Sequence, residues 1–325
     1  MSFLFEENVD RSLIVGSKVA IVGYGNQGHA HALNLRDSGI DVVIGAHQSG
    51  ASWSNAISDG FTPRSASDAT RGAEFVMLTL PDTAMPAIFT SEIQPNLRDD
   101  ALLLFAHGYC IHFGTIVSAT PVGLVSPKGP GKSLREKFVA GSGLPALVAA
   151  SAPDVLPKVM AYAWGIGSAR AGLLQTTFEE ETVTDLFGEQ AVLCGGIPEL
   201  IKAAFQTLVD AGYSPEVAYF ECMHEAKLIT DLLMERGFKG MREAISDTAE
   251  WGGYLSGPRL IDEGSKAELK EILAEIQGGS FAKTLEVEAA NGFEELRRRR
   301  REEAQSLLEK TWQKTHAPTK PISET

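Results

Sequence analysis

The sequence has few cysteines, no long apolar run and no excess of positive charge. Its three cysteines, Cys110, Cys194 and Cys222, are widely spaced in a chain of 325 residues, which indicates neither a disulfide framework nor a zinc site. The longest apolar runs, such as Ala101–Ala106, are far shorter than the roughly 20 residues of a membrane span. The chain also opens without the basic and apolar segments of a signal peptide. We therefore expect a cytoplasmic protein that does not bind a membrane.

The charge balance argues against a nucleic-acid-binding protein. Lys and Arg number 29 against 42 Asp and Glu, a formal net charge of −13, and a broad face of this sign repels phosphates. The run Arg297–Arg301 is flanked by Glu294, Glu295, Glu302 and Glu303, and we interpret it as an exposed helix because five consecutive residues cover all helix faces. Hydrophobic residues make up 44% and charged residues 22%, the balance of a globular protein.

The first half of the chain alternates short apolar runs with helical stretches. Continuous apolar strands separated by helices are typical of βαβ units and a parallel sheet. We therefore predict that residues 1–176 form an α/β domain with a Rossmann-type, doubly wound parallel sheet. After Phe178 apolar residues recur at three- and four-residue spacing, so residues 177–325 are predicted to form an all-α domain. The strand candidates are Lys18–Val22, Asp41–Ile44, Glu74–Leu80, Ala101–Ala106, Val122–Val125 and Ala146–Ala150.

A glycine-rich motif between the first strand and the first helix predicts a dinucleotide site. The segment 23–28, GYGNQG, fits the pattern G-x-G-x-x-G in the strand-to-helix context that the pattern requires. Gly23 permits the tight turn, Gly25 lets the backbone approach a pyrophosphate, and Gly28 lets helix and strand pack closely. The helix N-terminus then faces the anion.

The segment after the second strand selects between NAD and NADP. An acid there would bind the ribose 2′-hydroxyl, but residues 45–52 contain none. A 2′-phosphate would meet no repulsion and could bind His47, Ser49 or Ser52, although the segment has no Arg or Lys to pair with it. We favour NADP(H) and leave the use of NADH open.

Two pairs of acids in the helical half are candidate metal ligands. Asp185 and Glu189, and likewise Glu221 and Glu225, are four residues apart, so each pair shares one helix face. A hard cation such as Mg²⁺ would relieve the repulsion within each pair. Apolar neighbours such as Phe187 predict that the acids lie near a core, where they need partners. The alternative is a pair of solvated acidic helix faces.

Two further candidates stand at predicted strand ends. His107 follows the fourth strand directly and Lys128 follows the fifth. Parallel sheets bind ligands at the carboxyl ends of their strands. A lone His or Lys in a loop is commonly structural, but two at adjacent strand ends beside a nucleotide motif favour a role in catalysis.

Five longer motifs of the chain are GYGNQGHAHALN at 23–34, HGYCIHFG at 107–114, PKGPG at 127–131, DLFGEQ at 185–190 and YFECMHE at 219–225. Together they resemble those of ketol-acid reductoisomerases of the short, class I type, and the resemblance extends from about Ser12 to Ile276. It implies an enzyme of valine, leucine and isoleucine biosynthesis that depends on NADPH and two Mg²⁺ ions. Such an enzyme isomerises 2-acetolactate or 2-aceto-2-hydroxybutanoate by alkyl migration and reduces the product to the 2,3-dihydroxy-3-methyl acid.

The resemblance also implies roles for individual residues. His107, Lys128 and Glu189 would be catalytic, the last as a proton relay, and Ser246 would contact the substrate carboxylate. The metal ligands would be Asp185, Glu189, Glu221 and Glu225, with Asp185 bridging both ions. The cofactor-binding residues would be Gly23, Tyr24, Gly25, Asn26, Gln27, His47, Ser49, Ser52, Asp82, Thr83, Ala84, Met85 and Gly131.

The resemblance further implies a knotted helical domain and a homodimer, or an assembly of such dimers, in which each site uses residues of both chains. Most relatives have arginine where His47 stands, serine where Gly50 stands and alanine where Ser126 stands. A paralogue with altered substrate or cofactor choice therefore stays open. So do a metal-free dehydrogenase of the β-hydroxyacid type, which would work in excess EDTA, and a silent NADP-sensing protein.

Overall fold

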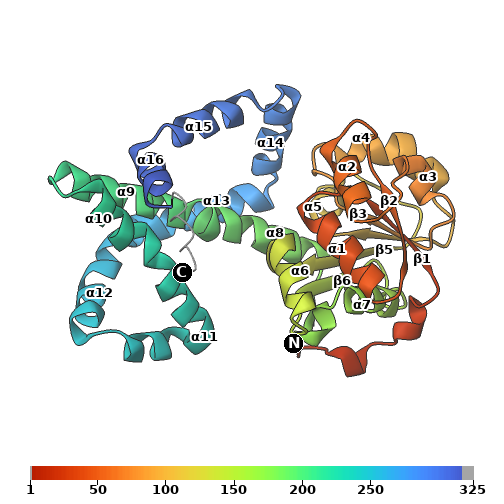
Figure 1. Ribbon diagram of the computed structural model, residues 1–325, viewed down its shortest axis with the longest axis horizontal. Coiled ribbons are helices and arrows are strands. Elements are labelled where there is room, and N and C mark those ends of the chain that lie inside the picture. The colour runs from red at the N-terminus through yellow and green to blue at the C-terminus, as the bar shows by residue number, and fades with distance from the viewer. Residues whose placement is uncertain (1, 317–325) are drawn as a thin grey trace, which may run out of the picture. The chain divides into compact units, whose positions relative to one another are not determined.

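The computed structural model describes residues 2–316, and its contacts divide the chain into two compact units (Figure 1). Unit 1 is Met1–Thr184 and unit 2 is Asp185–Thr325. The division falls inside one helix. The functional boundary after residue 176 stays a prediction, because the division into units follows from contacts alone.

Unit 1 contains a seven-stranded sheet in the order β2-β1-β3-β4-β5-β6-β7, with helices on its faces (Figure 1). All neighbouring strands are parallel except β5 and β6. β2 and β3 flank β1, so the chain changes direction across the sheet at β1, where ligands bind in such folds. The predicted α/β class is confirmed. The strands are β1 Lys18–Val22, β2 Asp41–Gly45, β3 Phe75–Leu78, β4 Leu102–Phe105, β5 Val122–Pro127, β6 Ala146–Ala150 and β7 Leu173–Gln175.

Two features of the sheet differ from the expectation. The pairing of β5 with β6 is antiparallel, because the chain re-enters the sheet beside the end of β5, where the Lys128 amide donates to the Pro145 carbonyl at 2.9 Å. Apolar runs do not encode strand direction. The three-residue strand β7 was not predicted, because Leu173–Gln175 is too short to give a periodic pattern.

Two helices of unit 1 are joined by buried polar contacts. Nδ1 of His31 in α1 lies 3.0 Å from the Tyr162 hydroxyl in α7, and Asn34 donates to the Ile166 carbonyl at 3.0 Å. His31 and Asn34 are fully buried, so these bonds satisfy groups that would otherwise be costly to bury. The helices of this unit are α1 Asn26–Asp37, α2 Ala51–Ser58, α3 Ala66–Thr70, α4 Met85–Ile88, α5 Tyr109–His112, α6 Gly131–Val139 and α7 Leu156–Gly165.

Unit 2 is helical, as predicted, and its described residues 185–316 contain no strand. It begins within α8 Phe178–Gly188, and two helical segments contain π-helical turns, Glu189–Leu193 and Phe220–His224. It contains a buried cluster of Phe205, Ala218 and Tyr219. The further helices are α9 Gly196–Asp210, α10 Pro215–Tyr219, α11 Ala226–Ala244, α12 Asp247–Leu260, α13 Glu263–Gln277, α14 Ser280–Ala290, α15 Glu294–Ala304 and α16 Leu307–Thr315.

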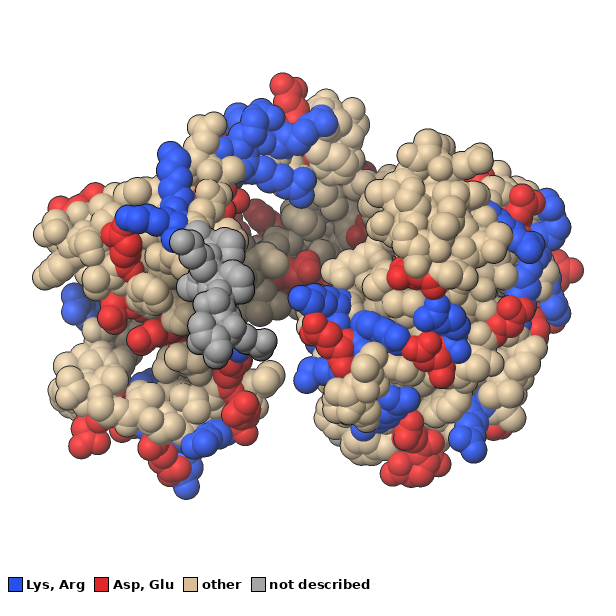
Figure 2. All heavy atoms as spheres, in the orientation of Figure 1, with Lys and Arg blue, Asp and Glu red and all other residues tan. Residues whose placement is uncertain are grey.

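The arginine run forms an exposed helix, as expected. Figure 2 shows Lys and Arg side chains gathered over α15. Arg298 pairs with Glu295 and Glu302 on the same helix, and Arg299 also pairs with Glu295. The flanking acids therefore neutralise part of this charge.

One helical stretch of unit 2 is unusually apolar for its exposure. Phe178–Asp210 is long and apolar enough, by length and composition, to cross a membrane, and 6% of its most apolar window is buried. A single stretch of this kind is weak support for a membrane span, because only its length and composition meet the requirement. The stretch also carries Glu181, Asp185 and Glu189, which are costly in a bilayer.

Candidate active site

The glycine motif forms the turn between β1 and α1, and two of its glycines have no room for a side chain. Gly23 has a φ of +101°, and a Cβ there would lie 2.6 Å from the Thr79 carbonyl oxygen. At Gly28 a Cβ would lie 2.2 Å from the Gly23 carbonyl oxygen. Gly25, which precedes α1, has nothing within 4 Å of such an atom. The backbone is therefore open where a phosphate would approach the first turn of α1.

Gly131 brings a second helix N-terminus against this turn. A Cβ at Gly131 would lie 1.9 Å from the Asn26 carbonyl oxygen, so α6 begins in close contact with α1. The side chain of Gln27 donates to the Gly129 carbonyl at 3.0 Å and ties the two loops together. The positive ends of two helix dipoles therefore meet where an anion would bind.

Gly131→Ala should destabilise unit 1 and weaken dinucleotide binding. The added methyl group cannot occupy its place without moving the backbone of Asn26, and overpacking of this kind costs about 1–3 kcal/mol. We expect a lower melting temperature and weaker binding in a fluorescence titration with NADPH. Gly252→Ala is the matched control, because a Cβ at Gly252 meets nothing within 4 Å. Wild-type melting and NADPH binding of the Gly131 variant would contradict the packing argument.

A cavity of about 720 Å³ opens at the carboxyl ends of β1 and β2. Of the predicted cofactor-binding residues, Gly23, His47 and Ser52 line it. Ser49 does not, and its hydroxyl lies 2.9 Å from Nδ1 of His47. Arg64 also lines the cavity, and sequence reasoning missed it because only the loop after β2 was considered.

The other predicted cofactor-binding residues lie elsewhere around the motif. Tyr24, Gly25 and Asn26 line a neighbouring hollow of about 540 Å³. The Tyr24 hydroxyl donates to Asp59 at 2.9 Å, and burial and that bond raise the pKa of Tyr24 above its ordinary value. Asp82, Thr83, Ala84 and Met85 follow β3 and lead into α4, and they do not line either hollow.

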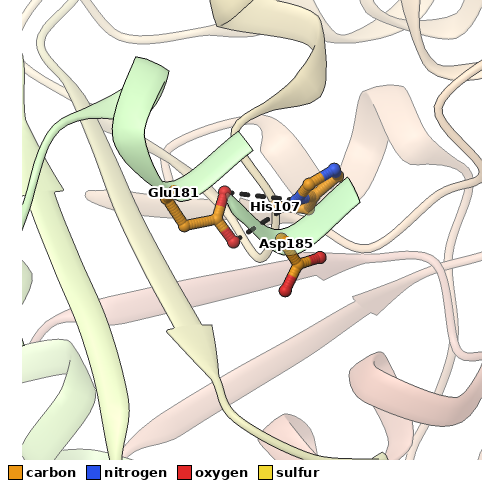
Figure 3. Close-up of side chains that lie close together, drawn as sticks. All are labelled: His107, Glu181 and Asp185. Atoms are coloured by element: carbon orange, nitrogen blue, oxygen red, sulfur yellow. Dashed lines mark hydrogen bonds and ion pairs between the residues drawn. The ribbon is translucent and has the colours of Figure 1, made fainter. Parts of the chain in front are cut away.

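The two residues predicted at strand ends meet at a buried carboxylate. Nδ1 of His107 lies 3.2 Å from one oxygen of Glu181 (Figure 3), and Nζ of Lys128 lies 3.2 Å from the other. The side chain of Glu181 is fully buried, while those of His107 and Lys128 are 21% and 33% exposed. The Gly108 amide also donates to Glu181 at 2.8 Å. One carboxylate therefore orients both candidate catalytic groups.

The surroundings of Glu181 keep it ionised. Burial by itself raises the pKa of this carboxyl, but the hydrogen bond and charge of His107, the charge of Lys128 and the Ser126 hydroxyl outweigh it and lower the pKa to about 2. Sequence reasoning missed Glu181. The signal was present, because Glu181 precedes Asp185 by four residues and so shares the helix face of the acids already singled out.

Asp185 lies one turn further along α8 and faces the same cluster (Figure 3). One ligand atom each of His107, Glu181 and Asp185 lie within 4.8 Å of one another. Among the described residues no other group of three such side chains lies this close together.

The expectation that apolar neighbours bury both acidic pairs is wrong for the single chain. Glu189, Glu221 and Glu225 are exposed, and Asp185 is partly buried. The apolar neighbours differ, since Phe220 is 44% exposed whereas Tyr219 is buried. Both pairs nevertheless occur at π-helical turns, because Glu189 begins one and Glu221 lies within the other. Such turns are frequent at functional sites.

Ser246, the predicted substrate contact, caps a helix. Its hydroxyl accepts a bond from the Ala249 amide at 3.2 Å at the start of α12. The side chain is exposed.

Two family models match the chain. The acetohydroxy acid isomeroreductase NADPH-binding domain matches residues 13–172, and the ketol-acid reductoisomerase C-terminal domain matches residues 178–320. The chain is 48% identical to the ketol-acid reductoisomerase (NADP(+)) of Rhodococcus jostii, covering 100% of this chain and 99% of that protein. The enzyme of the same name from Corynebacterium jeikeium is 50% identical, over 94% of this chain and 92% of that protein.

Solved structures give a consistent result. The structure of an NADH-preferring ketol-acid reductoisomerase from an uncultured archaeon matches with a TM-score of 0.95 and 39% identity, over 98% of this chain and 99% of that one. An NAD-binding semialdehyde dehydrogenase protein from Cupriavidus necator is 18% identical, with a TM-score of 0.61 over 81% of this chain. The second likeness concerns the fold alone.

Proposed function

The chain belongs to the ketol-acid reductoisomerase family, and we propose that its active site is built around the His107–Lys128–Glu181 cluster and the four acids Asp185, Glu189, Glu221 and Glu225. The reaction is the isomerisation and NADPH-dependent reduction of 2-acetolactate or its ethyl homologue. The observation that carries the site assignment is the buried carboxylate of Glu181, which holds His107 and Lys128 at 3.2 Å. Both groups stand at carboxyl ends of strands in the NADPH-binding domain.

The cluster has the properties that this chemistry needs. Glu181 accepts a hydrogen bond from Nδ1 of His107. Nε2, the other ring nitrogen, is thereby directed to exchange a proton with a substrate oxygen. Lys128 holds positive charge beside the same carboxylate, where it stabilises an oxyanion as the alkyl group migrates. Because Glu181 fixes both side chains, little reorganisation accompanies the reaction.

The donor set fits a hard divalent cation. Asp185 and Glu189 on one segment, and Glu221 and Glu225 on another, offer the carboxylate oxygens that Mg²⁺ prefers. When bound, Mg²⁺ polarises the hydroxyl, ketone and carboxylate oxygens of the substrate, and NADPH supplies the hydride. Glu181 is already engaged by His107, Lys128 and Gly108, so we assign it to the anchoring of these groups and Asp185 to the cation.

We further propose that a second copy of the chain completes the site. Among the described residues of unit 2 few large apolar side chains are buried, and a unit of this size needs more buried apolar surface for stability. Its helices expose many large apolar side chains, a feature of protein interfaces. Such a homodimer would cover the stretch Phe178–Asp210 and could bring Glu221 and Glu225 of one chain to the site of the other. The exposed residues include Val192, Leu193, Ile197, Leu200, Phe238, Trp251, Tyr254 and Leu255.

The cation proposal predicts that turnover requires Mg²⁺. With racemic 2-acetolactate we expect rapid oxidation of NADPH in Mg²⁺ and a loss of at least about 100-fold in excess EDTA, because loss of a Lewis acid costs several kcal/mol in the transition state. Restored Mg²⁺ should restore the rate. Full activity in EDTA would instead favour a metal-free dehydrogenase. Tight NADPH binding without turnover of any such substrate would favour the sensing protein.

We also propose NADPH as the preferred cofactor and the cytoplasm as the location. The curated relatives are named for NADP(+), whereas the similar solved structure is described as NADH-preferring. In this chain the loop after β2 carries no acid to repel a 2′-phosphate. Rates of NADPH and NADH oxidation under the same conditions test the preference.

A further inference from the structure

The loop after β2 contains no arginine or lysine, yet an arginine from a distant part of unit 1 reaches the cavity that this loop lines. The Arg64 amide donates to the Ile44 carbonyl at 2.9 Å, and the Ala46 amide donates to the Arg64 carbonyl at 2.9 Å. These bonds extend the outer edge of β2 by one parallel bridge between Gly45 and Arg64. The backbone of Arg64 is thereby fixed beside the carboxyl end of β2, next to His47.

The guanidinium of Arg64 is available to a ligand. Arg64 is exposed and lines the cavity of about 720 Å³ together with His47, Gln48 and Ser52. Within the described chain its side chain makes no ion pair or hydrogen bond. The neighbouring arginine, Arg71, differs in this respect, because it binds Asp68 at 3.0 Å and Asn96 at 2.9 Å.

Two acids, Asp68 and Glu92, also line the cavity. Their positions bear on whether the cavity can accept an anion beside Arg64. Asp68 accepts from Arg71 and from the Ser65 hydroxyl, each at 3.0 Å, so its charge is largely compensated. Glu92 belongs to the π-helical turn Phe89–Ile93 after α4. Neither acid lies in the loop that follows β2, where a carboxylate would select the ribose 2′-hydroxyl of NAD.

We propose that Arg64 binds the 2′-phosphate of NADPH and makes this chain selective for NADPH over NADH. Arginine suits this task because its planar guanidinium donates two parallel bonds to one phosphate. The hydroxyl of Ser52, on the loop side of the same cavity, supplies a second contact. The inference deepens the cofactor preference proposed above and rests on it.

A different role for Arg64 would leave a different signature. A guanidinium can also stack on the adenine ring, which NADPH and NADH share. Stacking would strengthen the binding of both cofactors equally, whereas a hydrogen bond to the 2′-phosphate strengthens the binding of NADPH alone. Ligand fragments with and without the 2′-phosphate therefore separate the two roles.

The test is a calorimetric titration of the full chain with 2′,5′-ADP and with 5′-AMP, for the wild type and Arg64→Gln. Loss of one charge-assisted phosphate contact should weaken the binding of 2′,5′-ADP by about 10- to 100-fold. The binding of 5′-AMP should weaken by less than about twofold. The salt dependence of 2′,5′-ADP binding should decrease in the variant. Equal weakening of both ligands, or of neither, would overturn the proposal.

Two further variants make the result specific. Arg98→Gln removes one positive charge from the same unit, but Arg98 pairs with Asp100 at 2.8 Å outside the cavity, and we expect wild-type binding. Arg64→Lys keeps the charge and loses the two-bond geometry, so an intermediate affinity for 2′,5′-ADP is expected. Binding by Arg64→Lys as weak as that by Arg64→Gln would count against charge recognition. Should Arg64→Gln unfold, the comparison of Arg64→Lys with wild type still decides the question, because an unchanged 2′,5′-ADP affinity would overturn the proposal.

Enzyme kinetics then separate this inference from the proposed reaction. The ratio of kcat/KM for NADPH to that for NADH should decrease by about 10- to 100-fold in Arg64→Gln. A chain that never turns over 2-acetolactate, but shows the expected 2′,5′-ADP result, would refute the reaction and support the role of Arg64. If Arg64→Gln turns over 2-acetolactate with an unchanged ratio of kcat/KM for NADPH to that for NADH, the result would support the reaction and refute the role of Arg64.

Discussion

Asp185→Asn should lower the turnover of 2-acetolactate by about 1,000-fold or more, with unchanged binding of NADPH. The amide keeps the size of the side chain but removes the charge that a hard cation needs. Loss of about 4 kcal/mol of transition-state stabilisation corresponds to this factor. Asp185 is partly buried, and one ligand atom each of Asp185, His107 and Glu181 lie within 4.8 Å of one another, so the substitution removes a charge from within this cluster.

The measurement combines kinetics with metal binding. NADPH oxidation at saturating Mg²⁺ gives the loss of turnover, and titration calorimetry with Mg²⁺ alone gives the loss of cation affinity. Asp210→Asn is the matched control, because Asp210 lies at the end of α9 and accepts from Gln206 on its own helix. Wild-type turnover by Asp185→Asn would contradict the assignment of Asp185 as a metal ligand.

Glu181→Gln should reduce both stability and activity. The amide can still accept from Gly108, but it no longer offers a negative charge to His107 and Lys128. Removal of one partner from a buried pair costs about 3–5 kcal/mol. Because His107 and Lys128 are 21% and 33% exposed, water screens part of the loss, and about 1–3 kcal/mol is expected. Misplacement of both catalytic groups should lower kcat by about 100-fold.

The pH dependence of stability gives Glu181 a distinctive signature. Its pKa is lowered from 4.5 to about 2 by its partners, so its stabilising contribution is present above pH 4.5 and is lost as the pH falls toward 2. The difference in unfolding free energy between wild type and Glu181→Gln should therefore shrink below about pH 4.5. Urea unfolding at several pH values measures this difference.

Glu179→Gln is the control for this series. Glu179 lies two residues earlier on the same helix and is exposed, so its replacement should change neither stability nor kcat by a measurable amount. A Glu181 variant that matches this control at neutral pH would contradict the anchoring role of the buried carboxylate.

Features with a local cause were predictable from the sequence. The glycine motif marks the turn between β1 and α1, because Gly23 and Gly28 meet backbone atoms close in the chain or on the next strand. The apolar runs marked six of the seven strands, and the spacing of apolar residues marked the helical second half. The acids Asp185 and Glu189 stood out because residues four apart share a helix face.

Features that depend on distant contacts were decided by the tertiary structure. Arg64 reaches the cavity because its backbone pairs with the edge of β2. No local sequence pattern predicts that the chain returns to this edge. Glu181 meets His107 across 74 positions of sequence, and its low pKa arises from that meeting. The direction of β6 follows from where its connection ends. Periodicity records which faces of an element are apolar, whereas burial, charge pairing and strand direction depend on what the rest of the fold places beside it.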